Sequence, residues 1–315
     1  MKSNSSVSDS VQLVRVEKSH IGQRLDNFLI RHLKGVPRTR IYRLIRRGEV
    51  RVNKKRCKPE RKLDIGDEVR IPPYTSNYSE NTAKPSPALQ EFLLNSILFE
   101  NDELLVINKP AGMAVHGGSS VAMGLIEGLR QCKPNWGELE LAHRIDRGTT
   151  GCLVISKNSI FLKYIQHQFK VKSVKKHYLA LVHGSWPGSL TFVDAALQKD
   201  PVGENERIVR VLESGKPSLT RFTVKQHFDG ASLIEAMPET GRTHQIRVHC
   251  QHSGHGIVGD DKYTFKAKNS TLAKVKNLCL HAWKIEFDMP EGAAPISVEA
   301  AIPNHLDALI QILGK

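Results

Sequence analysis

Apolar residues recur in two patterns that separate a helical beginning of the chain from a strand-rich remainder. Helical spacing predicts one helix from Gln23 to Leu33 and a second between Pro37 and Gly48. Later helices are predicted at 158–169, after Arg242, and at 305–313. Short apolar or alternating runs predict strands at 104–107, 139–145, 152–155, 177–182, 207–212, 220–227, 232–237, 279–287 and 295–302. Many strands with few helices predict an α+β domain with a mixed, mostly antiparallel sheet.

Composition divides the chain of 315 residues into four segments. Residues 1–11 are polar and predict a disordered tail, and residues 12–73 predict a small α/β domain. Residues 74–90 are rich in Ser, Asn, Thr and Pro, which is typical of a flexible linker. The remaining residues, 91–315, form the larger domain, so the length is consistent with two folded units.

The net charge of +14 is concentrated in the first quarter of the chain. Residues 1–73 hold 19 lysines and arginines against 8 acidic residues, which leaves +11 there. Such a module typically binds a polyanion, and nucleic acid is favoured over acidic lipid. No apolar run approaches the length of a membrane-spanning helix. Five scattered cysteines indicate reduced thiols in a cytoplasmic protein, and a monomer is the simplest expectation.

The second predicted helix has a narrow apolar face, Ile41, Leu44 and Ile45, and is otherwise lined with arginines. Such a helix can pack on a core while its guanidinium groups bind phosphates, although a merely solvated basic face is the alternative. The order of two short helices, "GEVRVNKKR" and "GDEVRIP" resembles the S4-like RNA-binding domain. The candidate RNA-binding residues here are Arg38, Arg40, Arg43, Arg46, Arg47, Lys54 and Lys55.

Asp146 is the most distinctive candidate for chemistry in the larger domain. It lies between Arg144 and Arg147, after an apolar run and before the turn-forming Gly-Thr-Thr-Gly. Nearby guanidinium groups favour an ionised carboxylate, which could act as a nucleophile, a general base or a metal ligand. Taken alone, the same residue could equally cap a turn and pair with an arginine.

Other candidates are ambiguous on their residue types alone. Tyr178 fits a core position at the end of a strand, and Arg242 fits either an anion site or the surface. A group of histidines and cysteines suggests zinc, but it lacks both a CxxC pair and the HExxH arrangement, so no metal site is predicted. Its members are His244, His249, Cys250, His252, His255, Cys279 and His281.

Four motifs, "INKPAGMAVHGG", "HRIDRGTTG", "HYLALVHG" and "GRTHQIRVH", occur in an order that resembles the pseudouridine synthase family, which includes ribosomal large-subunit enzymes. The resemblance implies that Asp146 is the essential catalytic residue and that Arg242 pairs with it. It further implies that Tyr178 stacks on the target base and serves the final proton transfer, and that Arg144 displaces this base from the RNA stack. Gly148 and Thr150 stand where relatives often have Asp and Ser.

The implied reaction turns specific uridines into pseudouridine in large-subunit (23S) ribosomal RNA, with base flipping and no cofactor. Asp146 would either attack the ribose or abstract a ribose proton to give a glycal, and the sequence leaves both routes open. Transfer RNA as substrate, a non-catalytic RNA-binding or ribosome-assembly protein, and a nucleoside hydrolase are the alternatives. A hydrolase normally needs a second carboxylate, and none stands out near these motifs.

Overall fold

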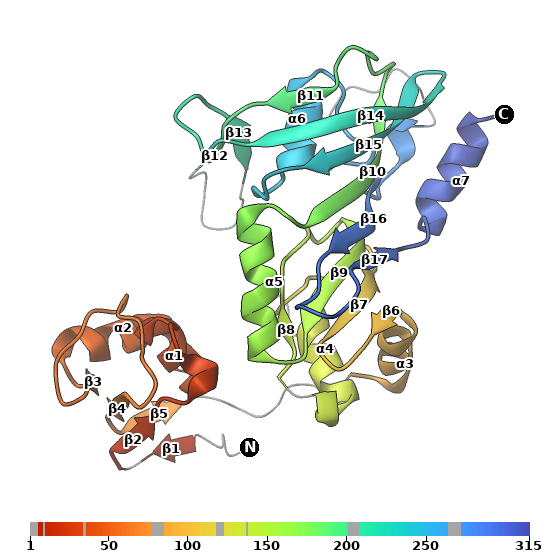
Figure 1. Ribbon diagram of the computed structural model, residues 1–315. Helices are drawn as coiled ribbons and strands as arrows, with labels where there is room; N and C mark the ends of the chain where they lie inside the picture. Colours follow the sequence, from red (N-terminus) through yellow and green to blue (C-terminus); the bar gives the residue numbers. More distant parts are fainter. Residues whose placement is uncertain are drawn as a thin grey trace, which may run out of the picture. The chain divides into compact units, whose positions relative to one another are not determined.

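The computed structural model describes residues 6–8, 10–33, 36–76, 85–117, 123–136, 138–200, 208–263 and 272–315. The chain separates into two compact units, Met1–Lys84 and Pro85–Lys315, each of which has its own core (Figure 1). No helix among these residues combines the length and the apolar character needed to cross a membrane.

The smaller unit packs two helices on a three-stranded sheet. Helix α1 spans Leu25–His32 and helix α2 spans Arg38–Arg47, close to the predicted ranges. Gly48 ends α2 in a left-handed conformation with φ of 72°, which glycine adopts without strain. The sheet has the order β2 (Gln12–Arg15), β4 (Glu68–Ile71), β3 (Arg51–Val52). A short 3-10 helix, η1, covers Lys18–His20.

The expected disordered tail and flexible linker are both partly wrong. Strand β1 (Ser6–Ser8) pairs with β5 (Tyr74–Ser76), two short segments without apolar alternation that could signal a strand. Helix α3 (Pro87–Asn95) begins inside the predicted linker, where the Ser86 hydroxyl accepts from the Leu89 amide and Pro87 occupies the first turn. The rest of that linker, 77–84, lies outside the described residues.

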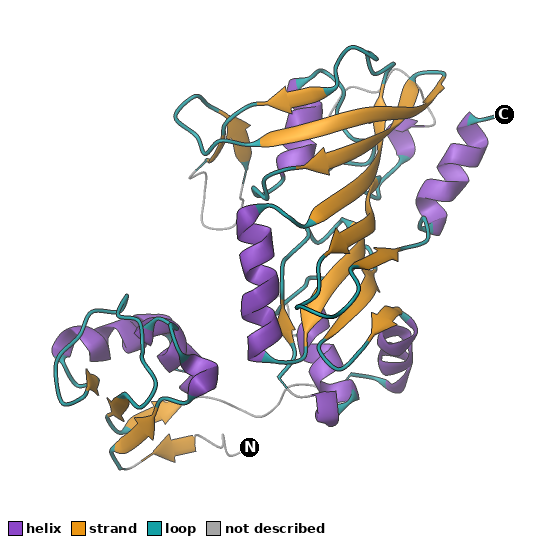
Figure 2. Cartoon of the chain, in the orientation of Figure 1, coloured by secondary structure: helices purple, strands orange, loops and turns teal. Residues whose placement is uncertain are grey.

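A ten-stranded sheet forms the centre of the larger unit, in the order β11-β14-β15-β10-β16-β9-β7-β6 (Figure 2). Strand β17 also pairs with β16, and β8 with β9. All of these pairs are antiparallel except β9 with β16, which confirms the predicted α+β fold with a mixed, mostly antiparallel sheet. The strands are β6 (Ile97–Glu100), β7 (Leu104–Lys109), β8 (Glu140–Leu141), β9 (Thr150–Ser156), β10 (Lys175–His183), β11 (Phe192–Asp194), β14 (Leu219–Phe228), β15 (Ala231–Pro238), β16 (Leu280–Phe287) and β17 (Ile296–Glu299).

Helices cover the sheet through apolar faces. Helix α5 (Ser159–Val171) starts at the predicted cap, Asn158, and buries Phe161 and Ile165, while α6 (Gln245–His252) buries Ile246 and Cys250. In Figure 1, α5 lies beside β8 and β9, and α6 lies behind β14 and β15. The remaining elements are α4 (Leu125–Cys132), α7 (Asn304–Leu313), the hairpin β12 (Leu197–Lys199) and β13 (Val209–Val211), and two 3-10 helices, Pro134–Trp136 and Leu272–Lys274.

The strand predicted at 139–145 is much shorter, because only Glu140–Leu141 forms β8. Beyond Leu141 the pairing with β9 is continued by a side chain. The Ala142 amide donates to the Val154 carbonyl, but the Val154 amide donates to Nε2 of His143 at 3.0 Å. The histidine ring thus takes the place of a backbone acceptor, and the chain is released into a loop before it reaches Asp146.

Gly151 allows the parallel pairing of β9 with β16 to form directly after this loop. It pairs with Ala282 and has a φ of 106°, which L side chains rarely adopt. A Cβ atom at this position would also overlap the carbonyl group of Ala282. Glycine is therefore needed here both for the backbone conformation and for the close approach of β16.

Gly151→Ala should lower the free energy of unfolding by about 3 kcal/mol, because strain and overlap act together. Urea unfolding followed by circular dichroism would measure this. Gly188→Ala is the control, since its added Cβ would meet open space at an ordinary φ, and it should change stability by less than about 0.5 kcal/mol. Equal stability of the two variants would contradict this account of Gly151.

Candidate active site

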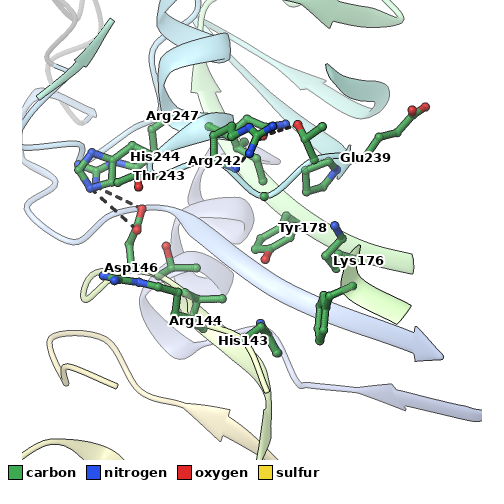
Figure 3. A pocket seen from close by; sticks show the side chains of 18 of the residues that line it. His143, Arg144, Asp146, Lys176, Tyr178, Glu239, Arg242, Thr243, His244 and Arg247 are labelled. Carbon is green, nitrogen blue, oxygen red and sulfur yellow. Dashed lines mark hydrogen bonds and ion pairs between the residues drawn. The ribbon is translucent and has the colours of Figure 1, made fainter. Parts of the chain in front are cut away.

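A cleft of about 590 Å³ opens in the larger unit where the loop after β8 faces the turn between β15 and α6 (Figure 3). Strand β10 contributes one wall and the end of α5 another. The cleft brings Arg144 and Asp146 together with Tyr178 and Arg242, which come from distant parts of the sequence. Its other polar lining residues are His143, Thr149, Gln166, Lys170, Lys172, Lys176, Glu239, Thr240, Thr243, His244, Gln245 and Arg247.

A buried lysine, Lys109, holds the loop that carries Asp146. Lys109, at the end of β7, is fully buried, and its ammonium donates to the carbonyls of Pro110, Met113 and Arg147 at 2.7–3.0 Å. Burial lowers the pKa of Lys109 to about 8, although the negative charge of Asp146 opposes this shift. Arg147 Nε in turn donates to the Gly112 carbonyl. These bonds connect two loops and fix the backbone next to Asp146.

Asp146 forms its ion pair with Arg247, from the first turn of α6. The distance from Arg247 Nη1 to Asp146 Oδ2 is 3.5 Å, and His244 Nε2 lies 3.9 Å from Oδ1. The Asp146 side chain is 22% exposed while that of Arg247 is only 6% exposed. The carboxylate is therefore open to the cleft, whereas the cation that orients it is enclosed.

Asp260 holds the other edge of the same guanidinium. Its two carboxylate oxygens accept from Arg247 Nε and Nη2, both at 2.7 Å, and its side chain is fully buried. Burial alone would raise the pKa of Asp260, but the bonds to Arg247 hold it below its usual range. Burial alone would likewise lower the pKa of Arg247, which the bonds to Asp260 keep above its usual value. Both groups are thus charged, as a bidentate pair requires.

Tyr263 connects this pair to His244. Its ring lies 5.1 Å from the centre of the Arg247 guanidinium. Its hydroxyl accepts from the Val209 amide at 3.0 Å and lies 2.8 Å from His244 Nδ1. A hydroxyl that accepts from Val209 is free to donate to Nδ1, which favours the imidazole tautomer with its proton on Nε2, facing Asp146. Burial lowers the pKa of His244, which favours this neutral ring.

The expected pair between Asp146 and Arg242 is not formed. Arg242 is exposed, its Nε donates to the Pro217 carbonyl at 3.2 Å, and its backbone amide donates to Gln245 Oε1. Both arginines belong to the motif "GRTHQIRVH", and the sequence offered no way to decide between them. The choice depends on α6 beginning only at Gln245, which turns Arg247 inward and leaves Arg242 on the rim.

Tyr178 lines the cleft from β10, at an irregularity in the pairing with β16 between His177 and Leu179. Its side chain is half-buried. Burial, and then the nearby negative charge of Asp146, raise the pKa of Tyr178 well above its usual range. It is therefore a neutral phenol that presents an aromatic ring to the cleft. An oriented, accessible carboxylate beside such a ring can serve as a nucleophile or a base toward a planar substrate.

The proposed RNA-contacting residues occupy both units. Arg144 is exposed on the cleft. Those of the smaller unit lie along α2 and in the turn after β3, where Asn53 and Lys54 have positive φ. Arg40 is partly exposed, and the other residues of this set are exposed: Arg38, Arg43, Arg46, Arg47, Lys54 and Lys55.

The histidine and cysteine residues considered for zinc have separate surroundings. His249 lies against Ser218, His281 against Thr150 and His255 against the His183 carbonyl. Within the described part of the chain, no three His, Cys, Asp or Glu side chains are placed to bind a metal ion together.

Comparison with known proteins gives a consistent result over nearly the whole chain. The family model described as RNA pseudouridylate synthase matches residues 103–252, and that of the S4 domain matches residues 23–69. Proteins named ribosomal large subunit pseudouridine synthase C are similar. The one from Haemophilus influenzae is 45% identical over 98% of this chain and 97% of its own, and the one from Salmonella typhimurium is 47% identical over 96% and 97%.

Two human structures share the fold of the larger unit. Human RNA pseudouridylate synthase domain containing 4 has a TM-score of 0.61 at 24% identity, covering 72% of this chain and 96% of its own. Human RNA pseudouridylate synthase domain containing 1 has a TM-score of 0.54 at 26% identity, covering 70% and 94%.

Asp260→Asn should destabilise the protein by about 3 kcal/mol, because it leaves the enclosed Arg247 without its bidentate partner. Asp261→Asn is a matched control, since Asp261 also lies 3.3 Å from Arg247 Nη2 but its side chain is 81% exposed. That variant should stay within about 0.5 kcal/mol of wild type. Chemical unfolding at pH 7 measures both, and similar losses would contradict a special role for Asp260.

His143 should make the protein sensitive to mild acid. Burial lowers its pKa to about 3, and Nε2 must stay unprotonated to accept from Val154. A base with a lowered folded-state pKa binds its proton in the unfolded chain first, so stability falls as the pH drops below about 6.5. Between pH 6.5 and 5 the loss should reach about 2 kcal/mol. Urea unfolding of His143→Gln should lack this part of the acid dependence. Identical profiles of stability against pH for the variant and wild type would contradict this role of His143.

Proposed function

The chain belongs to the RNA pseudouridylate synthase family, and from that membership we propose that it isomerises specific uridines to pseudouridine in large-subunit (23S) ribosomal RNA. The substrate is inferred from the names of relatives, ribosomal large subunit pseudouridine synthase C, which this chain matches over almost their full length. The basic surface of α2 and the match to an S4 domain support an RNA substrate. All residues that line the cleft come from the larger unit of one chain, so we propose that the protein acts as a monomer. The proposed ribosomal RNA substrate favours action in the cytoplasm.

The observation that carries the catalytic assignment is the ion pair of the accessible Asp146 with the enclosed Arg247. The reaction breaks the bond between ribose carbon 1′ and uracil nitrogen 1, and forms a bond from carbon 1′ to carbon 5. The proton on carbon 5 is finally lost and one is gained at nitrogen 1, so no electrons are exchanged. Asp146 either attacks carbon 1′ or removes a ribose proton to give a glycal, and Arg247 orients its carboxylate in both cases.

Tyr178 and Arg144 are proposed to handle the base. A uridine must leave its stack to enter the cleft, where an aromatic side chain can hold it. Tyr178 supplies that ring, and the exposed Arg144 is placed to fill the space left in the RNA. Because Tyr178 is a neutral phenol, it can accept the carbon 5 proton only while passing its own proton to a second acceptor. Arg242 is proposed to bind substrate at the rim.

Tritium release from RNA labelled at uracil carbon 5 tests this function. Wild type should release tritium from a large-subunit ribosomal RNA transcript, and Asp146→Asn should lower kcat by at least about 10³-fold because the nucleophile or base is lost. RNA binding by the variant, measured by filter retention, should match wild type, which controls for misfolding.

Each other result of this assay changes a different part of the proposal. Activity retained in Asp146→Asn would reject the catalytic residue. Release from transfer RNA transcripts alone would replace the substrate but keep the chemistry. Tight RNA binding with no release from any transcript would point to a non-catalytic RNA-binding protein.

A further inference from the structure

Lys176 is a cation inside the cleft that the proposed chemistry does not use. It precedes Tyr178 by two positions in β10, so both side chains lie on the same face of the strand. Both line the cleft, and Figure 3 shows Lys176 next to Tyr178, on the side away from Asp146. Lys176 is half-buried, and among the described residues no hydrogen bond or ion pair reaches its ammonium.

The surroundings of Lys176 make its charge unfavourable in the free protein. Burial, and then the like charge of Lys172, lower the pKa of Lys176 to about 8, while Glu239 opposes this shift without forming an ion pair with it. A lysine with a structural role is normally paired or extends into water. Lys109, which is fully buried, is satisfied by three carbonyls. Lys176 lacks such partners, which is typical of a group whose partner arrives with the substrate.

The lining of the cleft carries further positive charge. Lys170 lies in the last turn of α5, Lys172 is the C-cap residue of that helix, and Arg242 lies on the rim. The two helical lysines alone would prove little, because basic residues commonly complement the C-terminal end of a helix. Lys176 lies in a strand and has no such explanation. The charges therefore favour an anion on this wall, and the anion of an RNA substrate is its backbone phosphate.

We propose that Lys176 binds a backbone phosphate next to the flipped uridine while the uracil lies against Tyr178. This inference rests on the proposed function, because it takes the occupant of the cleft to be a nucleotide of RNA. Positions i and i+2 of a strand lie about 6.6 Å apart, a separation comparable with that between a base and its own phosphate. Strand β10 thus presents Tyr178 to the base and Lys176 to the backbone. The hydrogen bond between the Lys176 ammonium and the phosphate strengthens when the cleft excludes water.

The test measures how RNA binding depends on salt, in the full chain carrying Asp146→Asn so that the RNA stays unmodified. The probe is a large-subunit ribosomal RNA transcript. Adding Lys176→Gln should weaken binding by about tenfold. It should also reduce the slope of log Kd against log salt by about 0.7 to 0.9, the contribution of one phosphate. Lys176→Arg should keep most of the slope, because a guanidinium also binds phosphate.

Lys175→Gln is the matched control, because it makes the same charge change at an exposed neighbour that does not line the cleft. Its slope should equal that of the Asp146→Asn parent. Lys176→Met, which keeps the apolar stem, should not lower the Tm, whereas a structural lysine would. A parental slope for Lys176→Gln would overturn the proposal. So would a loss of kcat with unchanged Kd when Lys176→Gln is made in the active enzyme, since this would indicate a role in the chemistry.

Failure of this inference can be distinguished from failure of the proposed function. Tritium release by wild type reports the function independently of Lys176. If release occurs but the slope is unchanged, only the phosphate contact is wrong. If no RNA releases tritium but the slope falls, Lys176 binds RNA in a protein with another function.

Discussion

The guanidinium of Arg247 has two hydrogen-bonding edges, and the candidate site depends on how two carboxylates divide them. Asp260 binds Nε and Nη2, which leaves Nη1 for Asp146. Because Asp260 already balances the charge of Arg247, the pair orients Asp146 without fully neutralising it. A free carboxylate edge thus remains available to a substrate. Removing Asp260 would take the bidentate partner from the enclosed Arg247, and removing Arg247 would leave the fully buried Asp260 without its guanidinium partner, so the three residues are held together as a unit.

The fold brings these groups together from separate elements. Asp146 comes from the loop between β8 and β9, which Lys109 fixes through the Arg147 carbonyl. Arg247 comes from α6, and Tyr178 from β10 in the middle of the sheet. The parallel contact of β9 with β16 places the two halves of the sheet next to each other directly after the Asp146 loop. Glycine at 151 permits the close approach of these two strands directly after the loop.

The sequence predicts this fold well where its pattern is strong and local. The helices at 25–32, 38–47 and 159–171 have apolar faces and recognisable ends, and the central strands are apolar runs. Strands β1 and β5 were missed because their stability comes from pairing across the smaller unit, not from their own residues. The motifs predicted Asp146 and Tyr178 as site residues. They did not reveal Lys109, Asp260 or the choice of Arg247 over Arg242, since these depend on where a helix begins and on which carbonyls surround a buried ammonium.

Lys109 and Lys176 both lose hydration, but the first has a structural role and the second is proposed to bind substrate. Burial lowers the pKa of each to about 8. Lys109 donates to three carbonyls of two adjoining loops, so its charge is solvated by the protein and stabilises the native backbone. Lys176 has no comparable acceptor among the described residues, and its charge adds nothing to the stability of the free protein. A lysine without a protein partner that faces the same cleft as Asp146 is best explained by what the cleft binds. Uracil is neutral, so the anion proposed for Lys176 is the phosphate of the nucleotide backbone.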